Sequence, residues 1–133
     1  MKKNIAVIGC GYWGKNLVRN FFELGVLASI CDPNHSIANT FAKKYNVKSC
    51  SFAVILDDPN IKGVVLAVPA ELHASMAIDV MNKGKHVFVE KPLALNIEEL
   101  NSIQEAYSKS AGTLMIGFNR RFSPHIRKIK SFV

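Results

Sequence analysis

The chain has 133 residues, of which 49% are hydrophobic and 20% charged, which excludes a disordered or fibrous protein and predicts one domain over residues 1–133. No apolar stretch approaches the roughly 20 residues that cross a bilayer, and the N-terminus runs directly into a glycine turn, so we expect a cytoplasmic protein without membrane contact. The net charge of +7 is concentrated after Glu105, where basic residues follow and acidic ones do not. Because no nucleic-acid motif accompanies this charge, nucleic acid is disfavoured as a partner.

The first half of the chain alternates continuous apolar runs, typical of buried strands, with helical spacing of apolar residues. In chain order the elements are a strand at 4–9, a helix at 12–24, a strand at 27–32, a helix beginning after Asn34 and a short strand near Val47. Gly25 ends the first helix, and Asn34 caps the second. At residues 57–59 the pattern breaks, which indicates a surface loop.

The second half continues the alternation. Its elements are a strand at 63–69, a helix at 71–83, a strand at 85–90, a helix from Asn96 to Tyr107 and a strand at 113–118. Asn96 and Glu99 have the spacing of a capping box at the start of the last helix. Apolar strands that alternate with amphipathic helices predict a Rossmann-type, doubly wound parallel sheet with helices on both faces and right-handed crossovers.

The three cysteines, Cys10, Cys31 and Cys50, are odd in number and have neither the spacing of a metal site nor that of a redox motif. Two of them, Cys10 and Cys31, lie in or beside predicted strands. We therefore expect reduced, buried thiols and no metal site.

Three glycines follow the first predicted strand with the spacing Gly9-x-Gly11-x-x-Gly14. Between a strand and a helix, such a turn presents free amides and the positive end of the helix dipole to a pyrophosphate. Gly9 permits the tight turn, Gly11 lets phosphates approach the backbone, and Gly14 lets the helix pack against the strand. The context therefore favours a dinucleotide site over a simple chain reversal.

Asp32 ends the second predicted strand, eighteen residues after Gly14. At that place a carboxylate accepts hydrogen bonds from the adenosine ribose hydroxyls. It also repels a 2′-phosphate, and the following residues Pro33 to Ser36 supply no lysine or arginine, so NAD is favoured over NADP. The competing interpretation makes Asp32 a turn residue or helix cap, and a cap is compatible with a ribose contact.

The stretch VFVEKPLA at residues 87–94, with AVPAELH before it and GFNRRFSP after it, resembles the glucose-fructose oxidoreductase and inositol dehydrogenase (Gfo/Idh/MocA) family. With the glycine turn, these motifs occur in the family's order and cover essentially the whole chain. The resemblance implies an NAD(P)-dependent oxidoreductase that acts on a hydroxyl of a sugar, cyclitol or nucleotide sugar.

The resemblance also implies residue roles. Lys91 matches the family's EKP lysine near the nicotinamide and the reacting hydroxyl, where an ammonium orients the substrate oxygen and stabilises alkoxide character. Glu90 is implied to be an orienting partner rather than a base, and Pro92 to fix the turn, with a cis bond as one option. Without the resemblance, Lys91 has an equally good interpretation as a surface lysine at a strand end.

Further cofactor contacts are implied at Tyr12 and Trp13, inside the glycine turn, and at Pro69 and His73, after the fourth strand. For His73 a plain structural role near a helix start is an equal alternative. The family often has Asn directly after the proline of this turn, and here Ala70 takes its place.

Two hints about the substrate conflict. The segments GYWGKNLVRNF and AVPAELH look like members that oxidise nucleotide sugars, whereas GFNRRFSP looks like the inositol dehydrogenase branch. Arg120 and Arg121 are candidates to meet an acidic substrate group or another part of a longer protein.

Family members also carry a second α/β domain that supplies an Asp or His near the reacting hydroxyl. We therefore expect this chain to be the cofactor-binding part of a longer homo-oligomeric protein, binding cofactor without turnover by itself. A non-catalytic NAD-sensing module and an S-adenosylmethionine-binding domain are the competing functions.

Overall fold

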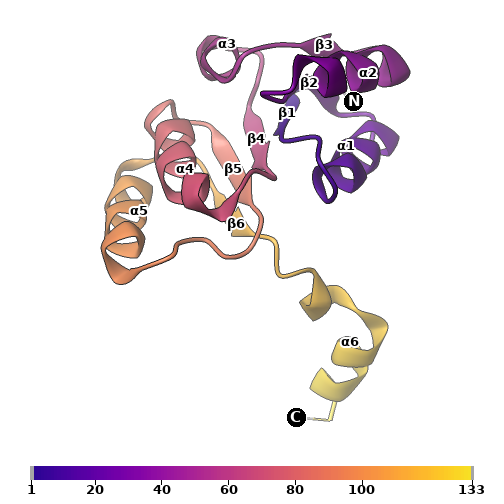
Figure 1. Ribbon diagram of the computed structural model, residues 1–133. Helices are drawn as coiled ribbons and strands as arrows, with labels where there is room; N and C mark the ends of the chain where they lie inside the picture. Colours follow the sequence, from indigo (N-terminus) through magenta and orange to yellow (C-terminus); the bar gives the residue numbers. More distant parts are fainter. Residues whose placement is uncertain (1, 133) are drawn as a thin grey trace.

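In the computed structural model, which describes residues 2–132, six parallel strands form one sheet in the order β3-β2-β1-β4-β5-β6 (Figure 1). The strands are β1 (Ile5–Ile8), β2 (Leu27–Cys31), β3 (Lys48–Ser49), β4 (Gly63–Leu66), β5 (His86–Val89) and β6 (Leu114–Ile116). The helices are α1 (Gly14–Glu23), α2 (His35–Tyr45), α3 (Phe52–Asp57), α4 (His73–Asn82), α5 (Ile97–Lys109) and α6 (Pro124–Lys130). The order 3-2-1-4-5-6 is that of a Rossmann fold, as the alternation of elements predicts.

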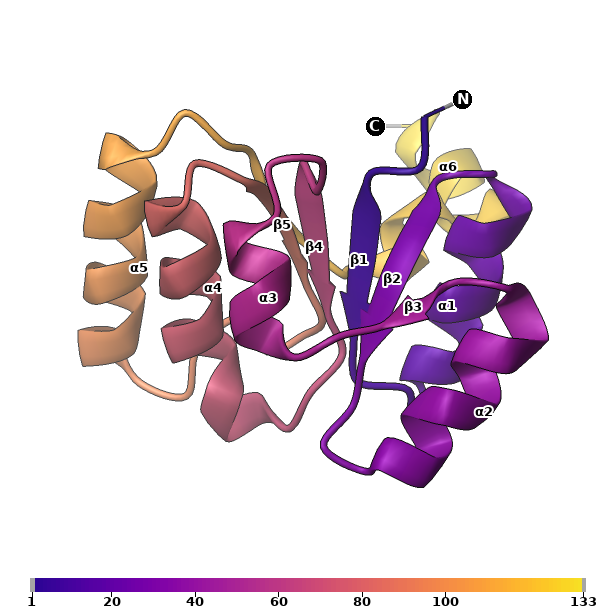
Figure 2. The same ribbon diagram turned by 90° about the horizontal axis from the view of Figure 1, so that it is seen from above.

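The sheet separates two apolar cores, because neighbouring residues of a strand point to opposite faces. Val7 and Val65 belong to the core under α1 and α2, whereas Ala6, Ile8 and Leu66 belong to the core under α3, α4 and α5. Figure 2 shows the two groups of helices on opposite sides of the strands. The strands β1, β2, β4 and β5 consequently have apolar residues packed on both faces, which explains their nearly continuous apolar sequences, whereas both residues of β3 are exposed.

Predicted capping interactions are present. The Asn34 side chain accepts from the amides of Ser36 and Ile37 at the start of α2. At α5, Asn96 Oδ1 accepts from the Glu99 amide at 2.8 Å, while Glu99 Oε2 reaches back to the amide of Leu95 rather than to that of Asn96. The capping box therefore forms with its return bond displaced by one residue.

Two short helices lie outside the sequence-based expectations. α3 occupies the segment before the predicted loop and begins at Ser51, whose hydroxyl accepts from the Val54 amide. α6 begins at Ser123, whose hydroxyl accepts from the Ile126 amide, with Pro124 in the first turn. Both starts are side-chain caps of the usual kind, but each helix is shorter than the window in which helical periodicity is recognisable.

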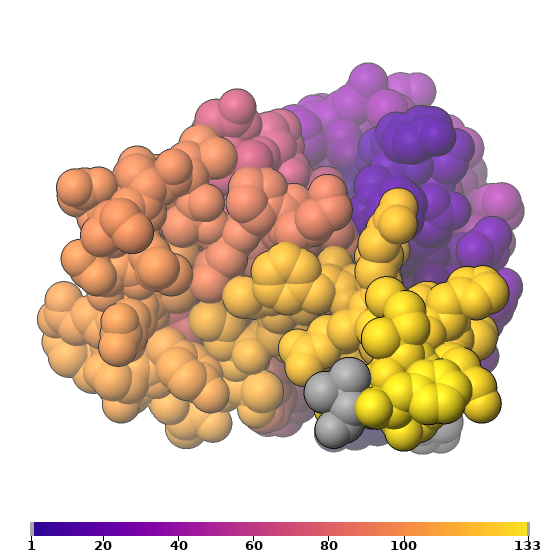
Figure 3. Space-filling model, turned by 90° about the horizontal axis from the view of Figure 1, so that it is seen from below, coloured from indigo at the N-terminus to yellow at the C-terminus, as the bar shows by residue number. Residues whose placement is uncertain are grey.

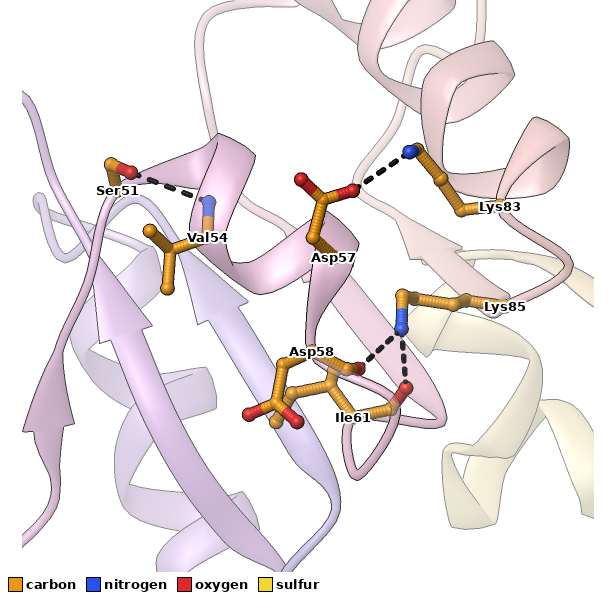
Figure 4. Close-up of polar contacts among 7 residues, drawn as sticks. All are labelled: Ser51, Val54, Asp57, Asp58, Ile61, Lys83 and Lys85. Carbon is orange, nitrogen blue, oxygen red and sulfur yellow. Dashed lines mark hydrogen bonds and ion pairs between the residues drawn. The ribbon is translucent and has the colours of Figure 1, made fainter.

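α3 is anchored to the amino-terminal edge of the sheet by two lysines (Figure 4). Lys83 Nζ lies 2.7 Å from a carboxylate oxygen of Asp57, in an exposed ion pair. Lys85 is only 7% exposed, and its ammonium donates to the carbonyl oxygens of Asp58 and Ile61 at 2.7 and 2.8 Å. Burial lowers the pKa of Lys85, partly offset by the nearby Asp58 carboxylate. These contacts fix the loop between α3 and β4.

The C-terminal segment stands away from the sheet. A 3-10 turn at Asn119–Phe122 leads into α6, and the space-filling view from below shows this segment in yellow on the molecular surface (Figure 3). Its apolar side chains Phe122, Ile126, Ile129 and Phe132 are exposed, and so are Met115 of the adjoining strand β6 and Phe118, which follows that strand. No helix within residues 2–132 is long and apolar enough to cross a membrane.

Candidate functional site

The candidate site lies along the carboxyl ends of the parallel strands. The connection after β1 leads to α1 on one face of the sheet, whereas the connection after β4 leads to α4 on the other. In open parallel sheets, this switch in direction creates the crevice in which ligands bind. The glycine turn, Asp32, Pro69 and Glu90 all follow strands at this edge.

The glycine turn is tightly packed at two of its three glycines. Gly9 has a φ of 90°, and a Cβ there would collide with the carbonyl oxygen of Ala67. A Cβ at Gly14 would collide with the carbonyl oxygen of Gly9, so α1 starts directly against the turn. A Cβ at Gly11 would meet no atom within 4 Å, which leaves open space in front of its backbone. The turn therefore fits the approach of a pyrophosphate at Gly11 and the start of α1.

Asp32 ties the end of β2 to the glycine turn. Its Oδ2 accepts from the Cys10 amide at 2.7 Å, and its Oδ1 accepts from the Asn34 amide at 2.9 Å. The second bond makes Asp32 a turn residue before α2, as the competing interpretation expects. Each carboxylate oxygen has further lone pairs, so these bonds leave capacity for ribose hydroxyls.

Asp32 also borders a pocket of about 270 Å³. The pocket is lined by Cys31, Asp32, Pro33, His35, Ser49, Cys50, Ser51 and Phe52. Among these described residues there is no lysine or arginine. The expectation of buried thiols is correct for Cys10 and wrong for Cys31 and Cys50, which are half-buried because they lie where β2 and β3 end at this pocket.

A larger pocket of about 470 Å³ lies on the other side of the glycine turn. It is lined by Trp13, Ala67, Val68, Ala70, His73, Glu90, Lys91, Asn119 and Arg120. The structure thus brings together Trp13, His73, Glu90 and Lys91 from three separate motifs. Lys91 is exposed at the pocket, and its peptide bond to Pro92 is cis.

Trp13 and Glu90, which both line this pocket, join the glycine turn to the EKP motif. The Trp13 indole Nε1 donates to Glu90 Oε1 at 2.7 Å. On the other side, a Cβ at Gly117 would come within 3.0 Å of the same carboxylate, so the strand end of β6 approaches it closely. Glu90 is therefore held in place by its neighbours, and its orienting role stays a prediction.

His73 is 2% exposed and links two turns of the site. Its Nδ1 lies 2.6 Å from the carbonyl oxygen of Pro92, and its Nε2 lies 2.9 Å from the carbonyl oxygen of Val68. Because carbonyl oxygens only accept, both contacts are hydrogen bonds only when both ring nitrogens carry protons. The ring fixes the turn after β4 relative to that after β5, and its contact with a cofactor stays a prediction.

Two predicted residues, Tyr12 and Pro69, are not among the residues that line this pocket. Tyr12 is 87% exposed, with the Lys15 ammonium 5.1 Å from its ring centroid, and Pro69 follows β4 next to the pocket. Asn119, which also lines the pocket, is absent from the sequence-based candidates. Its position in the GFNRRF stretch, directly after the last strand, is the sequence feature that could have identified it as a candidate.

A family model described as an oxidoreductase family with an NAD-binding Rossmann fold (Gfo/Idh/MocA) matches residues 3–118. Among curated relatives, scyllo-inositol 2-dehydrogenase (NAD+) of Bacillus subtilis is 34% identical over 125 residues, which cover 90% of this chain and 36% of the relative. Myo-inositol 2-dehydrogenase of Thermotoga maritima is 30% identical over 133 residues, with 97% and 40% covered.

A solved structure of an inositol dehydrogenase also resembles this chain. Scyllo-inositol dehydrogenase from Lactobacillus casei, with bound NAD(H) and scyllo-inositol, superposes with a TM-score of 0.92 at 25% identity, over 99% of this chain and 41% of that one. The chain thus spans about two fifths of the length of these relatives. The matched segment contains the glycine turn, Asp32 and the EKP motif. The chain belongs to the Gfo/Idh/MocA oxidoreductase family, and residues 3–118 are its NAD-binding Rossmann fold.

Proposed function

We propose that this chain is the cofactor-binding domain of an NAD-dependent dehydrogenase that takes hydride from a hydroxyl-bearing carbon of a sugar, cyclitol or nucleotide sugar. The observation that carries the proposal is the 470 Å³ pocket in which Trp13, Glu90 and Lys91 meet beside the glycine turn. A bound dinucleotide supplies a hydride acceptor there. The relatives named as inositol dehydrogenases support a polyhydroxylated substrate.

The two pockets suit the two ends of a dinucleotide. The smaller one offers Asp32 to the adenosine ribose, Gly11 leaves room for the pyrophosphate between the pockets, and the larger one takes the nicotinamide. NAD is preferred to NADP because the Asp32 carboxylate would face a 2′-phosphate without a lysine or arginine in the pocket lining.

Lys91 is the proposed catalytic residue of this domain. Its ammonium, exposed at the pocket that also holds Glu90, would bind the substrate hydroxyl oxygen and stabilise the negative charge that develops on it. Arg120 and Asn119 border the same pocket from the segment after β6 and offer donors to substrate hydroxyl or acidic groups. A separate general base is proposed to come from outside this chain.

We also infer a homo-oligomeric, cytoplasmic protein. The apolar side chains exposed on β6 and on the C-terminal segment support self-association, because monomeric proteins seldom expose several such side chains together. Sedimentation velocity over a concentration series tests this part, and a monomer throughout would refute it.

The first test is calorimetric titration of the chain with NAD, NADP and S-adenosylmethionine. Tight binding of NAD, weaker binding of NADP and none of S-adenosylmethionine are expected. Binding of S-adenosylmethionine alone would replace the proposal by a methyltransferase-type domain.

To distinguish a sensing module, the chain is joined to the remaining part of the Bacillus subtilis relative and assayed with inositols, sugars and nucleotide sugars. Binding of NAD without any NADH formation by that chimera would favour the sensor.

A further inference from the structure

Two of the three cysteines lie side by side at the adenosine end of the site. β2 pairs with β3 in parallel, with Ser29 opposite Lys48 and Ile30 opposite Ser49. Continued by one residue, this register places Cys31 beside Cys50, and the Cys50 amide donates to the Ile30 carbonyl oxygen at 3.0 Å. Neighbouring strands are about 4.8 Å apart, a spacing compatible with the Cα separation of disulfides.

The two side chains share a face and a pocket. Both pack against the core covered by α3, α4 and α5, and both line the 270 Å³ pocket beside Asp32. Cys10 belongs instead to the core under α1 and α2, on the other face of the sheet. No group of three or more His, Cys, Asp or Glu side chains suited to a metal ion occurs within residues 2–132, so these thiols are not part of a metal cluster.

We propose that Cys31 and Cys50 are a modification site, which hydrogen peroxide converts to a disulfide that weakens dinucleotide binding. The effect on binding rests on the proposed function, whereas disulfide formation does not.

The order of attack is assigned from the surroundings of Cys31 and Cys10. Burial, and then the charge of Asp32, raises the pKa of Cys31, although the Phe52 amide donates to its sulfur and opposes this rise. The same two causes raise the pKa of Cys10 to about 12, so that thiol stays protonated. Thiolate is the reactive form, and we therefore assign the first step to Cys50.

In the first step, the Cys50 sulfur attacks one oxygen of the peroxide. An S–O bond forms, the O–O bond breaks, and hydroxide takes up the thiol proton and leaves as water. Cys31 then attacks the Cys50 sulfur, an S–S bond forms, and the second oxygen leaves as water with the Cys31 proton. Two thiols lose two electrons in total, and one peroxide is reduced to two waters.

The disulfide would change the pocket wall. An S–S bond of about 2.05 Å draws the two sulfurs closer than unbonded thiols allow. The segment from Ser49 to Ser51, which carries Cys50 and caps α3, is then pulled towards the end of β2. This movement narrows the space beside Asp32 that the adenosine would occupy. We expect the dissociation constant for NAD to rise by at least about tenfold.

Peptide mapping tests the modification directly, because trypsin separates all three cysteines. Cleavage after Lys and Arg places Cys10 in residues 4–15, Cys31 in residues 20–43 and Cys50 in residues 49–62. The folded chain is treated with hydrogen peroxide, alkylated, digested and analysed by mass spectrometry without reduction. A link between peptides 20–43 and 49–62 within one monomer is expected. If peroxide leaves both thiols free, or links Cys10 instead, the proposed site is wrong.

Calorimetric titration of the reduced and the oxidised chain with NAD tests the expected loss of affinity. Reduction of the oxidised chain with a dithiol is the matched control, and it should remove the cross-link and restore the affinity. Cys50→Ser should bind NAD equally before and after peroxide. Unchanged affinity in a fully cross-linked wild-type chain would overturn the effect on binding. If the reduced chain does not bind NAD, the proposed function fails instead, and the peptide map still decides the site.

Discussion

The indole of Trp13 and the carboxylate of Glu90 are 77 positions apart in the chain, and a 2.7 Å hydrogen bond joins them. Trp13 lies in the turn after β1 and Glu90 directly after β5, so the bond spans the strand β4 between them. It connects the proposed phosphate turn with the residue that precedes Lys91. The glycine turn and the EKP motif are therefore parts of one structural unit.

Removing this hydrogen bond should lower the free energy of unfolding. A double-mutant cycle with Trp13→Phe and Glu90→Ala is expected to give a coupling of about 0.5–1.5 kcal/mol in the free energy of unfolding, the usual net value of a hydrogen bond. Trp13 is the only tryptophan, so its emission reports the change directly. The spectrum should shift in Glu90→Ala and much less in Glu90→Gln, which keeps an acceptor. Additive effects in the cycle would show that the contact carries no energy.

The cofactor preference is tested at Asp32. Asp32→Ala removes the acceptor for ribose hydroxyls and the charge that opposes a 2′-phosphate, so NAD affinity should fall and the ratio of NAD to NADP affinity should approach one. Calorimetry measures both constants. Asp32→Asn serves as a matched control, because it keeps an acceptor for the Cys10 amide while removing the charge. A wild-type chain that binds NADP as well as NAD would contradict the assignment.

Lys91 is tested by separating binding from turnover. In the chimera described above, Lys91→Ala should reduce kcat by roughly 10²-fold, the effect of losing a positioned charge-stabilising group. The affinity for NAD should change much less, because the pyrophosphate and ribose contacts lie elsewhere in the proposed site. Glu71→Ala, another charged residue just after β4 but outside the lining of the larger pocket, is the control. Normal turnover in Lys91→Ala would leave the lysine without a catalytic role.

Much of the fold follows from local sequence patterns. Apolar runs predict all six strands, including the short β3 near Val47, and the side-chain caps at Asn34 and Asn96 mark two helix starts. The glycine turn was predictable because Gly9 and Gly14 occupy positions where a side chain would collide with backbone. Predicted strands extend beyond the observed ones at several ends, and after β4 this is because the apolar residues Ala67 and Val68 continue past its last residue, Leu66.

Other features depend on contacts that a local pattern does not contain. The segment FAVILD reads as an apolar run, and its short helix α3 is held by tertiary contacts that include the ion pair of Asp57 with Lys83. Lysine is usually exposed, so the burial of Lys85 against two carbonyl oxygens had no sequence signal. The bond between Trp13 and Glu90 likewise requires the strand order.

The two lysines at α3 should differ in their contribution to stability. Lys85→Met keeps an apolar stem but leaves the carbonyl oxygens of Asp58 and Ile61 without their donor, which costs about 1–3 kcal/mol for buried acceptors. Lys83→Met removes only an exposed ion pair and should change the free energy of unfolding much less. Urea titration of both variants makes the comparison. Equal losses of unfolding free energy in the two variants would mean that the buried hydrogen bonds of Lys85 stabilise the fold no more than the exposed ion pair of Lys83 does.

Acid should weaken the same region through Asp57. The hydrogen bond from Lys83, followed by the charge of that lysine, lowers the pKa of Asp57 below its usual value of 3.8. A carboxyl group whose pKa is lower in the folded state binds protons more readily in the unfolded state. The stabilisation from Asp57 is therefore fully present above its unfolded-state pKa, and it is lost as the pH falls through its lower folded-state pKa. Asp57→Asn should therefore reduce stability at neutral pH and flatten the decline of the free energy of unfolding below about pH 4. Glu98→Gln, a carboxylate without an ion pair among the described residues, is the control. If Asp57→Asn and wild type lose stability in parallel over that range, the ion pair is not linked to folding.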